Sequence, residues 1–365
     1  MVFRLARTQI VLIFFVTLHF SCVRGIQPVI RESAPTLVVE GMISTDSAPY
    51  NVKLTFTGQL LNASAHIDSN QNYINDASVL IRDDQGDSCP FQLVSPGLYQ
   101  STNSNFLGAV GRTYVLEIHL ANGETYKSSP EQIPPVPPID SFSVVYDSTY
   151  ITDVRPTQII VSANVHDPEK TTNFYRWTSF GYVPRKSWGG PCTIGSPPCT
   201  DPYMCTCFAL CVQYHPDNAL NILSDQFVNG REIIQPVYYS PVYWFGRHFV
   251  EVKQMSLNRD LYIFWQQYLE QTARTGSILD PLPASLTGNI RNVADSNDVA
   301  LGYFQVSAVT TRKIIIVPYF LQEYLLASVA GSYIPPGDCH AEIPNSLGDD
   351  QDPPGWEDAE IIQMH

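Results

Sequence analysis

The chain has 365 residues, of which 44% are hydrophobic and 15% are charged, and its formal net charge is −14 at pH 7. Its length suggests about two domains, and because phosphate binding requires a basic face, the acidic balance excludes nucleic acid as a partner. The 28 prolines and 21 glycines predict many turns, so the composition favours a mainly β fold.

The N-terminal residues have the pattern of an export signal. An arginine-containing start precedes an apolar run at residues 10–18, which is too short to span a bilayer. Cys22 follows the small Ser21, at the position of a bacterial lipid-modification cysteine. We expect residues 1–21 to be a signal peptide and residues 22–35 to be a tether that begins at a lipidated Cys22. The alternative is an ordinary cleaved signal on a soluble exported protein.

Residues 36–132 contain short runs of strand-forming residues separated by turn residues. The run at 113–120 alternates apolar and polar side chains, and Asn122-Gly123 separates it from the next run, which is a strong hairpin signal. Strands spaced about ten residues apart predict a small β-sandwich of immunoglobulin-like or transthyretin-like type.

Residues 133–139 mark the clearest boundary in the chain. Prolines dominate this stretch, which favours a stiff, extended linker. Residues 140–334 resume the strand pattern and include an Asp167-Pro168 turn before an aromatic strand. We predict a second sandwich of fibronectin-like type, with one helix docked on it.

Five cysteines crowd a loop that we place at residues 182–220 and expect to be irregular. In an exported protein such a cluster predicts disulfides. The disulfide candidates are Cys192, Cys199, Cys205, Cys207 and Cys211, together with Cys339 near the C-terminus. Cys89 lies beside a strand and away from the cluster, so we expect it to be the free thiol.

Two groups of residues offer metal-binding alternatives. The zinc candidates are Cys205, Cys207, Cys211 and His215. The single residue between the first two departs from the usual ligand spacing, and no second paired set follows. Three aspartates, Asp83, Asp84 and Asp87, resemble part of a calcium loop but lack a glutamate at the required distance. We therefore expect a solvated turn there and no metal site in the chain.

The densest aromatic segment lies between residues 238 and 249. Prolines and Gly246 interrupt it, so we expect some of its rings to be exposed and to form an interface or stack on a sugar. The binding candidates are Tyr238, Tyr239, Tyr243, Trp244 and Phe245. The alternative is a loop whose rings line the core.

Residues 256–275 contain the one convincing helix pattern. Ser256 is the expected N-cap, Asp260 places a negative charge in the first turn, and Gly276 ends the helix. Apolar residues follow at helical spacing, namely Leu257, Leu261, Phe264, Trp265, Tyr268 and Leu269. Because such a stripe must dock on a sheet, we interpret its aromatic rings as core packing that needs no cofactor.

Three segments from the end of this helix onward carry a family resemblance. In order, they are Gly276-Ser-Ile-Leu-Asp-Pro-Leu-Pro283, Gly288-Asn-Ile-Arg-Asn-Val293 and Leu301-Gly-Tyr-Phe304. The chain resembles the Bacteroidota outer-membrane lipoproteins with domain of unknown function 4249 (DUF4249), over most of its mature length. The resemblance implies an envelope lipoprotein anchored through Cys22, of a kind often encoded beside TonB-dependent receptors. It implies no catalytic residues.

Residues 335–365 form an acidic C-terminal tail. No Lys or Arg follows Lys313. Members of the family often carry a second cysteine three residues after the position of Cys339, but Glu342 stands there in this chain, which leaves the pairing of Cys339 open. We interpret the acidic run as a solvated segment, and the alternative is a docking peptide for a basic partner.

The sequence contains no Gly-x-Ser-x-Gly elbow, no His-Glu-x-x-His motif and no phosphate-binding glycine loop. We therefore expect a non-enzymatic lipoprotein that acts as an accessory or binding component with a TonB-dependent outer-membrane receptor. One alternative is a surface protein that binds a glycan or peptide. Another is an envelope enzyme of unrecognised type.

Overall fold

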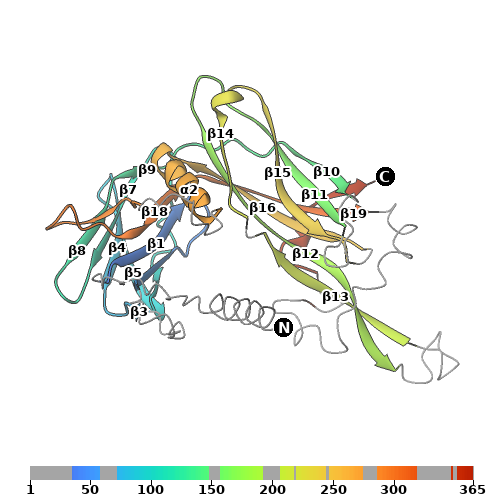
Figure 1. Cartoon of the computed structure of the whole chain (residues 1–365), viewed down its shortest axis with the longest axis horizontal. Coiled ribbons are helices and arrows are strands. Elements are labelled where there is room, and N and C mark those ends of the chain that lie inside the picture. The colour runs from blue at the N-terminus through green and yellow to red at the C-terminus, as the bar shows by residue number, and fades with distance from the viewer. Residues whose placement is uncertain are drawn as a thin grey trace, which may run out of the picture. The chain divides into compact units, whose positions relative to one another are not determined.

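The computed structural model describes residues 35–57, 72–147, 157–191, 206–217, 219–243, 246–273, 286–318, 347 and 352–364, with no side-chain description at 185–191 and 206–211. The described residues from Thr36 onward belong to one compact unit. Strands dominate these ranges, and α2 (Arg259–Thr272) is the one α-helix within them (Figure 1). The prediction of a mainly β, sandwich-like fold with a single docked helix is therefore confirmed.

The first sheet has eleven strands and folds around the first core. Its strands are β1 (Leu37–Ser44), β2 (Asn51–Phe56), β3 (Asn72–Tyr73), β4 (Ser78–Asp83), β5 (Ser88–Ser95), β6 (Leu98–Ser101), β7 (Thr113–His119), β8 (Thr125–Ser128), β9 (Glu131–Gln132), β17 (Ile290–Asn292) and β18 (Leu301–Ser307). The main path runs β17-β8-β7-β4-β5-β6-β2-β1-β18, while β3 pairs with β2 and β9 with β7. Alternation along the strands buries one face, which includes Val39, Leu54, Ile81 and Leu116.

The first sheet includes two strands that come from far along the chain. The sequence analysis assigned residues 286–307 to the second sandwich, but β17 pairs with β8, and β18 pairs in parallel with β1. The alternation of a strand shows which face is buried, but it does not identify the neighbouring strand. A parallel partner more than 250 residues away was therefore not visible in the sequence pattern.

Two further sheets enclose the second core. One contains β10 (Ser141–Asp147), β11 (Gln158–His166) and β15 (Glu232–Pro241). The other contains β12 (Phe174–Pro191), β13 (Thr206–Pro216), β14 (Asn221–Ser224), β16 (His248–Leu257), β19 (Val309–Pro318) and β20 (Glu360–Met364). Short 3-10 helices lie at Asp225–Phe227 and Trp356–Asp358. The core between the sheets includes Val161, Trp177, Val250 and Ile314.

The cysteine-rich region is more regular than expected. Strands β12 and β13 form a long antiparallel hairpin that pairs from Phe180 and Pro216 to Pro191 and Thr206. Only the connection at its tip, residues 192–205, lies outside the described residues. The prolines and glycines of this region suggested a loop throughout, but regular pairing between the two segments extends the strands through several of them.

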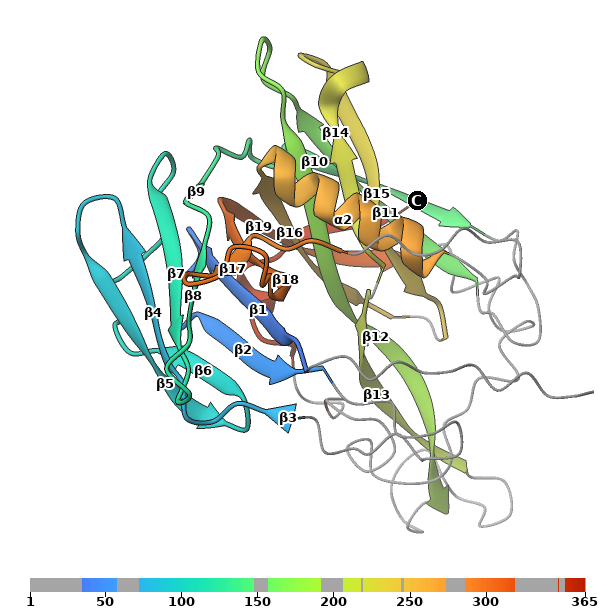
Figure 2. The same ribbon diagram turned by 60° about the vertical axis from the view of Figure 1, so that its left-hand side comes forward.

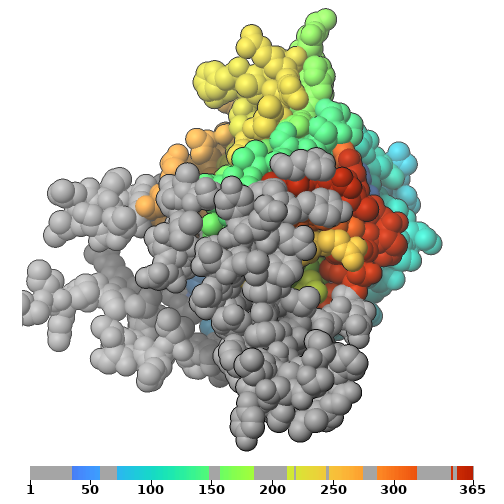
Figure 3. Space-filling model, turned by 90° about the vertical axis from the view of Figure 1, so that its right-hand side faces the viewer, coloured from blue at the N-terminus to red at the C-terminus, as the bar shows by residue number. Residues whose placement is uncertain are grey.

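The acidic tail is also partly structured. Strand β20 pairs in parallel with β19, Met364 enters the second core, and Arg312 forms an ion pair with Glu360. The end of the chain therefore adds an edge strand to the six-stranded sheet that contains β19, and Figure 3 shows it in red at the surface. The acidic side chains of Glu357, Asp358 and Glu360 are exposed, as expected for a solvated run, but the backbone of residues 356–364 forms a 3-10 helix and a paired strand. Basic residues on β19 and apolar residues on β20 explain this packing.

Helix α2 begins later than expected. Asn258, not Ser256, is the N-cap, because its side chain accepts a hydrogen bond from the backbone N–H of Leu261 at 2.8 Å. Ser256 is instead the penultimate residue of β16, where its Oγ donates to Pro134 O at 2.7 Å. Asp260 does lie in the first turn, as predicted. Gly276 lies outside the described residues.

Candidate ligand-binding cleft beneath helix α2

Two of the segments that carry the family resemblance meet beside the helix. The amide of Asn289 accepts from the Phe304 backbone N–H at 2.8 Å and donates to the Phe304 carbonyl at 2.9 Å. Gly302 has a φ of +89°, and a Cβ there would lie 2.1 Å from the carbonyl oxygen of Val39. A side chain at this position would therefore separate β18 from β1. These contacts fix the strand on which one wall of the cleft is built.

A buried carboxylate anchors the start of the helix to this strand. Glu131 is 6% exposed, and its Oε1 accepts from Ser129 Oγ at 2.6 Å, from Asn289 Nδ2 at 2.8 Å and from Tyr303 OH at 3.4 Å. Its Oε2 accepts from Asn258, the helix N-cap. Burial and the neighbouring carboxylate of Glu131 raise the pKa of Tyr303. Glu131 therefore accepts hydrogen bonds from several groups and holds the helix in place.

The cleft lies between α2, the first sheet and β12. Figure 2 shows the orange helix beside β12 and close to β18. The cavity has a volume of about 600 Å³. Strands β1 and β18 contribute Val38, Glu40, Met42, Leu301, Tyr303 and Gln305, while the helix contributes Phe264, Trp265 and Tyr268. Asn51 of β2, Arg176 of β12 and Leu286 complete most of the lining.

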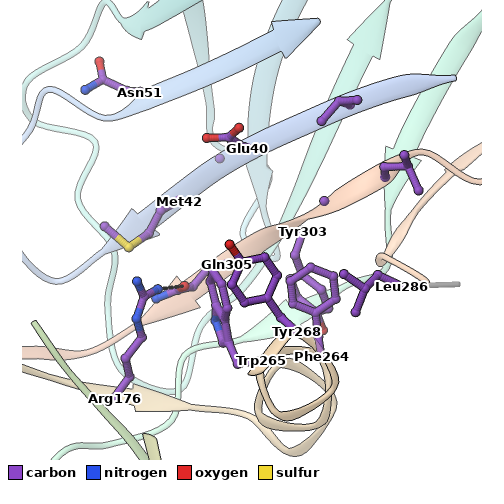
Figure 4. Close-up of a pocket in the computed structure, with 14 residues that line it drawn as sticks. Glu40, Met42, Asn51, Arg176, Phe264, Trp265, Tyr268, Leu286, Tyr303 and Gln305 are labelled. Atoms are coloured by element: carbon purple, nitrogen blue, oxygen red, sulfur yellow. Dashed lines mark hydrogen bonds between the residues drawn. The ribbon is translucent and has the colours of Figure 1, made fainter. Parts of the chain in front are cut away.

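The two ends of the cleft differ in polarity, as Figure 4 shows. Arg176 and Gln305 lie at one end, where the Arg176 guanidinium donates to Gln305 Oε1 at 3.3 Å. Phe264, Tyr303 and Leu286 lie together at the other, with the Phe264 and Tyr303 ring centroids 5.2 Å apart. This arrangement suits a ligand with one polar and one apolar end.

Arg176 is the unusual residue of the cleft. Its guanidinium carbon lies 4.4 Å from the centre of the Trp265 ring, in a cation–π contact. Burial lowers the pKa of Arg176. Among the described residues it has no carboxylate within ion-pair distance, and its Nε and the Nε1 of Trp265 are both buried without a hydrogen-bond partner. The site therefore presents a partly desolvated positive charge through the Nη groups of Arg176, while the Arg176 Nε and Trp265 Nε1 donors are buried.

Comparison with known families identifies the family of the chain. The family described as Domain of unknown function (DUF4249) matches residues 23–313. The chain belongs to this family. A comparison with curated proteins gives no match. In the described part of this DUF4249 protein, no helix has the length and apolar character needed to cross a membrane.

The predicted aromatic binding residues of this DUF4249 protein differ in their burial. Tyr238 is fully buried in the second core and its hydroxyl donates to His215 O at 3.1 Å, so its assignment to an exposed interface is wrong. Tyr239, on the opposite face of β15, is 44% exposed. Tyr243 is partly buried, while Trp244 and Phe245 lie outside the described residues. The alternation of a strand separates adjacent tyrosines in this way.

Most of the predicted cysteine chemistry falls outside what the structure describes. The backbone of β13 includes Cys207 and Cys211, but their side chains are not described. Cys22, Cys192, Cys199, Cys205 and Cys339 lie outside the described residues altogether. Cys89 is a buried free thiol in the first core, as expected.

The three aspartates that resemble part of a calcium loop contact an arginine. Arg112 forms ion pairs with Asp83, Asp84 and Asp87, and Asp83 also accepts from the backbone N–H groups of Gln85 and Asp87. The aspartates therefore surround an arginine in an ordered turn. No cluster of three or more His, Cys, Asp or Glu side chains suited to a metal occurs within the described ranges.

Sequence reasoning missed the cleft itself. It assigned Phe264, Trp265 and Tyr268 to the core, but only Phe264 is buried, while Trp265 is partly exposed and Tyr268 is 41% exposed. An apolar stripe that continues past the width of the docking surface leaves aromatic residues at the edge of the contact. Arg176 lies in an alternating strand and gave no signal of its own.

Proposed function

We propose that this protein is a non-enzymatic binding component of the cell envelope. In this proposal it is lipid-anchored at Cys22 in the outer membrane, works with a TonB-dependent receptor, and captures a ligand in the cleft beneath α2. The cleft is the observation that carries the binding function, because it combines aromatic walls with a positive charge that lacks an ion-pair partner among the described residues. Pockets of this kind orient a ligand through a few polar groups in an apolar setting.

The envelope assignment rests on other features. The arginine-containing start, the apolar run at residues 10–18 and Cys22 after Ser21 support export and lipidation. Membership of the DUF4249 family supports the same placement through the resemblance described above. A lipoprotein carries more than one acyl chain, and this gives a firm anchor.

The receptor contact is proposed for the aromatic segment at the end of β15 and directly after it. Tyr238 is excluded because it is buried, so the proposed contact includes Tyr239, Tyr243, Trp244 and Phe245. Tyr and Trp are common anchors of protein interfaces. This contact is separate from the cleft, whose lining residues come from other elements.

Co-purification from native membranes tests the proposal. The full-length tagged protein is expected in the membrane fraction with a β-barrel receptor, while Cys22→Ala should move it to the soluble envelope fraction. Replacing Tyr243, Trp244 and Phe245 together with Ala should reduce receptor recovery. The matched control is Tyr73→Ala, a tyrosine on β3 that is 38% exposed and lies outside the cleft lining, which should leave recovery unchanged. If the triple variant folds and recovers the receptor fully, the aromatic segment is not part of the interface.

A further inference from the structure

We infer that the cleft beneath α2 binds a small carboxylic acid with an apolar or aromatic body, and that Arg176 binds its carboxylate. This inference rests on the proposed binding function and names the class of ligand. It follows from three features: the hydrogen bonding of Arg176, the charges around it, and the shape of the opposite end of the cleft.

The guanidinium of Arg176 has donors to spare. A guanidinium carries five N–H groups, and here one bond, from Nη1 to Gln305 Oε1, is formed among the described residues. Gln305 is itself held by a bond of 2.9 Å from its Nε2 to Ser307 Oγ, so the acceptor is fixed. The stack on Trp265 fixes the plane of the guanidinium. Such a planar, pre-oriented group matches the two oxygens of a carboxylate.

The surrounding charges favour a monoanion. Among the described residues that line the cleft, Arg176 is the one basic residue and Glu40 is the one acidic residue. Glu40 is exposed on β1, beside Lys53 of β2 in the sheet register. A ligand with one negative charge is balanced by Arg176, whereas a phosphate dianion would keep an excess charge near Glu40. We therefore assign a carboxylate rather than a phosphate.

The other end of the cleft fits the body of the ligand. Phe264, Tyr303, Leu286 and Leu301 provide apolar surface, and Tyr268 is exposed at the edge. A cavity of about 600 Å³ has room for a small molecule with an aromatic ring. Because Tyr303 and Phe264 are held by the Glu131 network and by the packing of the helix, this end is formed before a ligand arrives.

A matched pair of probes tests the inference on the full-length protein. N-acetyl-L-phenylalanine and N-acetyl-L-phenylalaninamide have nearly the same shape, but only the first carries a carboxylate. Calorimetric titration should show the acid binding at least roughly tenfold more tightly, which is the usual effect of a charge-assisted hydrogen bond. Arg176→Gln should reduce this ratio to about one. Arg82→Gln, at an exposed arginine on β4, is the control and should leave the ratio unchanged.

A second variant and a longer probe sharpen the result. Glu40 is exposed, so Glu40→Gln removes a negative charge near the ligand without disturbing the core. It should strengthen binding of the acid by roughly twofold and leave binding of the amide unchanged. An N-acetylated tripeptide ending in phenylalanine tests the source of the carboxylate, and tighter binding of this peptide than of the single residue would overturn the small-acid assignment in favour of a peptide C-terminus. Equal binding of acid and amide would overturn the role of Arg176 and leave the binding function standing. Binding of none of the probes would contradict both the inference and the use of the cleft.

Discussion

Glu131 and Arg176 are two charged side chains that each contact β18 and the region of the helix, and they differ in how their charge is satisfied. Glu131 accepts hydrogen bonds from Ser129, Asn289, Tyr303 and the helix N-cap Asn258. Arg176 makes one hydrogen bond in the described part of the protein and stacks on Trp265. The carboxylate is thus integrated into the fold, whereas the guanidinium is available to a ligand.

The comparison separates structural from functional polar groups. A buried polar group with all its partners stabilises the structure, whereas one without them lowers stability. A residue of the second kind that lines an open cleft is a candidate binding residue, because a ligand supplies the missing partner.

His248 extends the comparison to the second core. Its Nδ1 is 2.7 Å from Ser240 Oγ, its Nε2 has no hydrogen-bond partner among the described residues, and burial lowers its pKa to about 3. Between pH 6.5 and 3 the unfolded chain binds a proton that the native protein does not, so stability falls as the pH falls through this window. The total effect is about 5 kcal/mol. Urea unfolding from pH 7.5 to 4 covers most of this window and should show a loss of about 3 kcal/mol, and His248→Gln should show a smaller one.

The structural role of Glu131 predicts the next largest effect. Glu131→Gln removes the charge and places a donor amide among side chains that already donate to this position. We expect a loss of about 3 kcal/mol in the free energy of unfolding. Glu124→Gln, at an exposed turn, is the control and should change stability little. An unchanged urea midpoint for Glu131→Gln would mean that this network does not hold the helix.

The N-cap of α2 predicts a smaller effect. Asn258→Ala removes the bond to the Leu261 N–H and the bond to Glu131. The loss should be about 1 kcal/mol or somewhat more. Thermal unfolding measures it, with Asn297→Ala in an exposed turn as the control. Equal melting temperatures for the two variants would contradict the assignment of Asn258 as the cap.

The sequence predicted local features better than long-range ones. The hairpin at Asn122-Gly123, the free Cys89 and the acidic first turn of the helix follow from neighbouring residues, and the structure contains each of them. The parallel pairing of β18 with β1 depends on residues far apart, and no local pattern encodes it.

The cleft was hidden from the sequence for the same reason. Arg176, Trp265 and Gln305 belong to a strand, a helix and another strand, and only the tertiary structure brings them together. A lone arginine in an alternating strand has the pattern of a solvent-facing residue. Likewise, the difference between the buried Tyr238 and the exposed Tyr239 depends on which face of β15 lies in the second core.

Arg176→Met provides the most direct test of the distinction between the two charged groups. Methionine keeps an unbranched chain but removes a partly desolvated charge that has one hydrogen bond. The account predicts that the free energy of unfolding stays within about 1 kcal/mol of the wild type or rises, while the preference for N-acetyl-L-phenylalanine over its amide disappears. A large loss of stability together with an unchanged preference would show that Arg176 is a structural residue and would contradict the account.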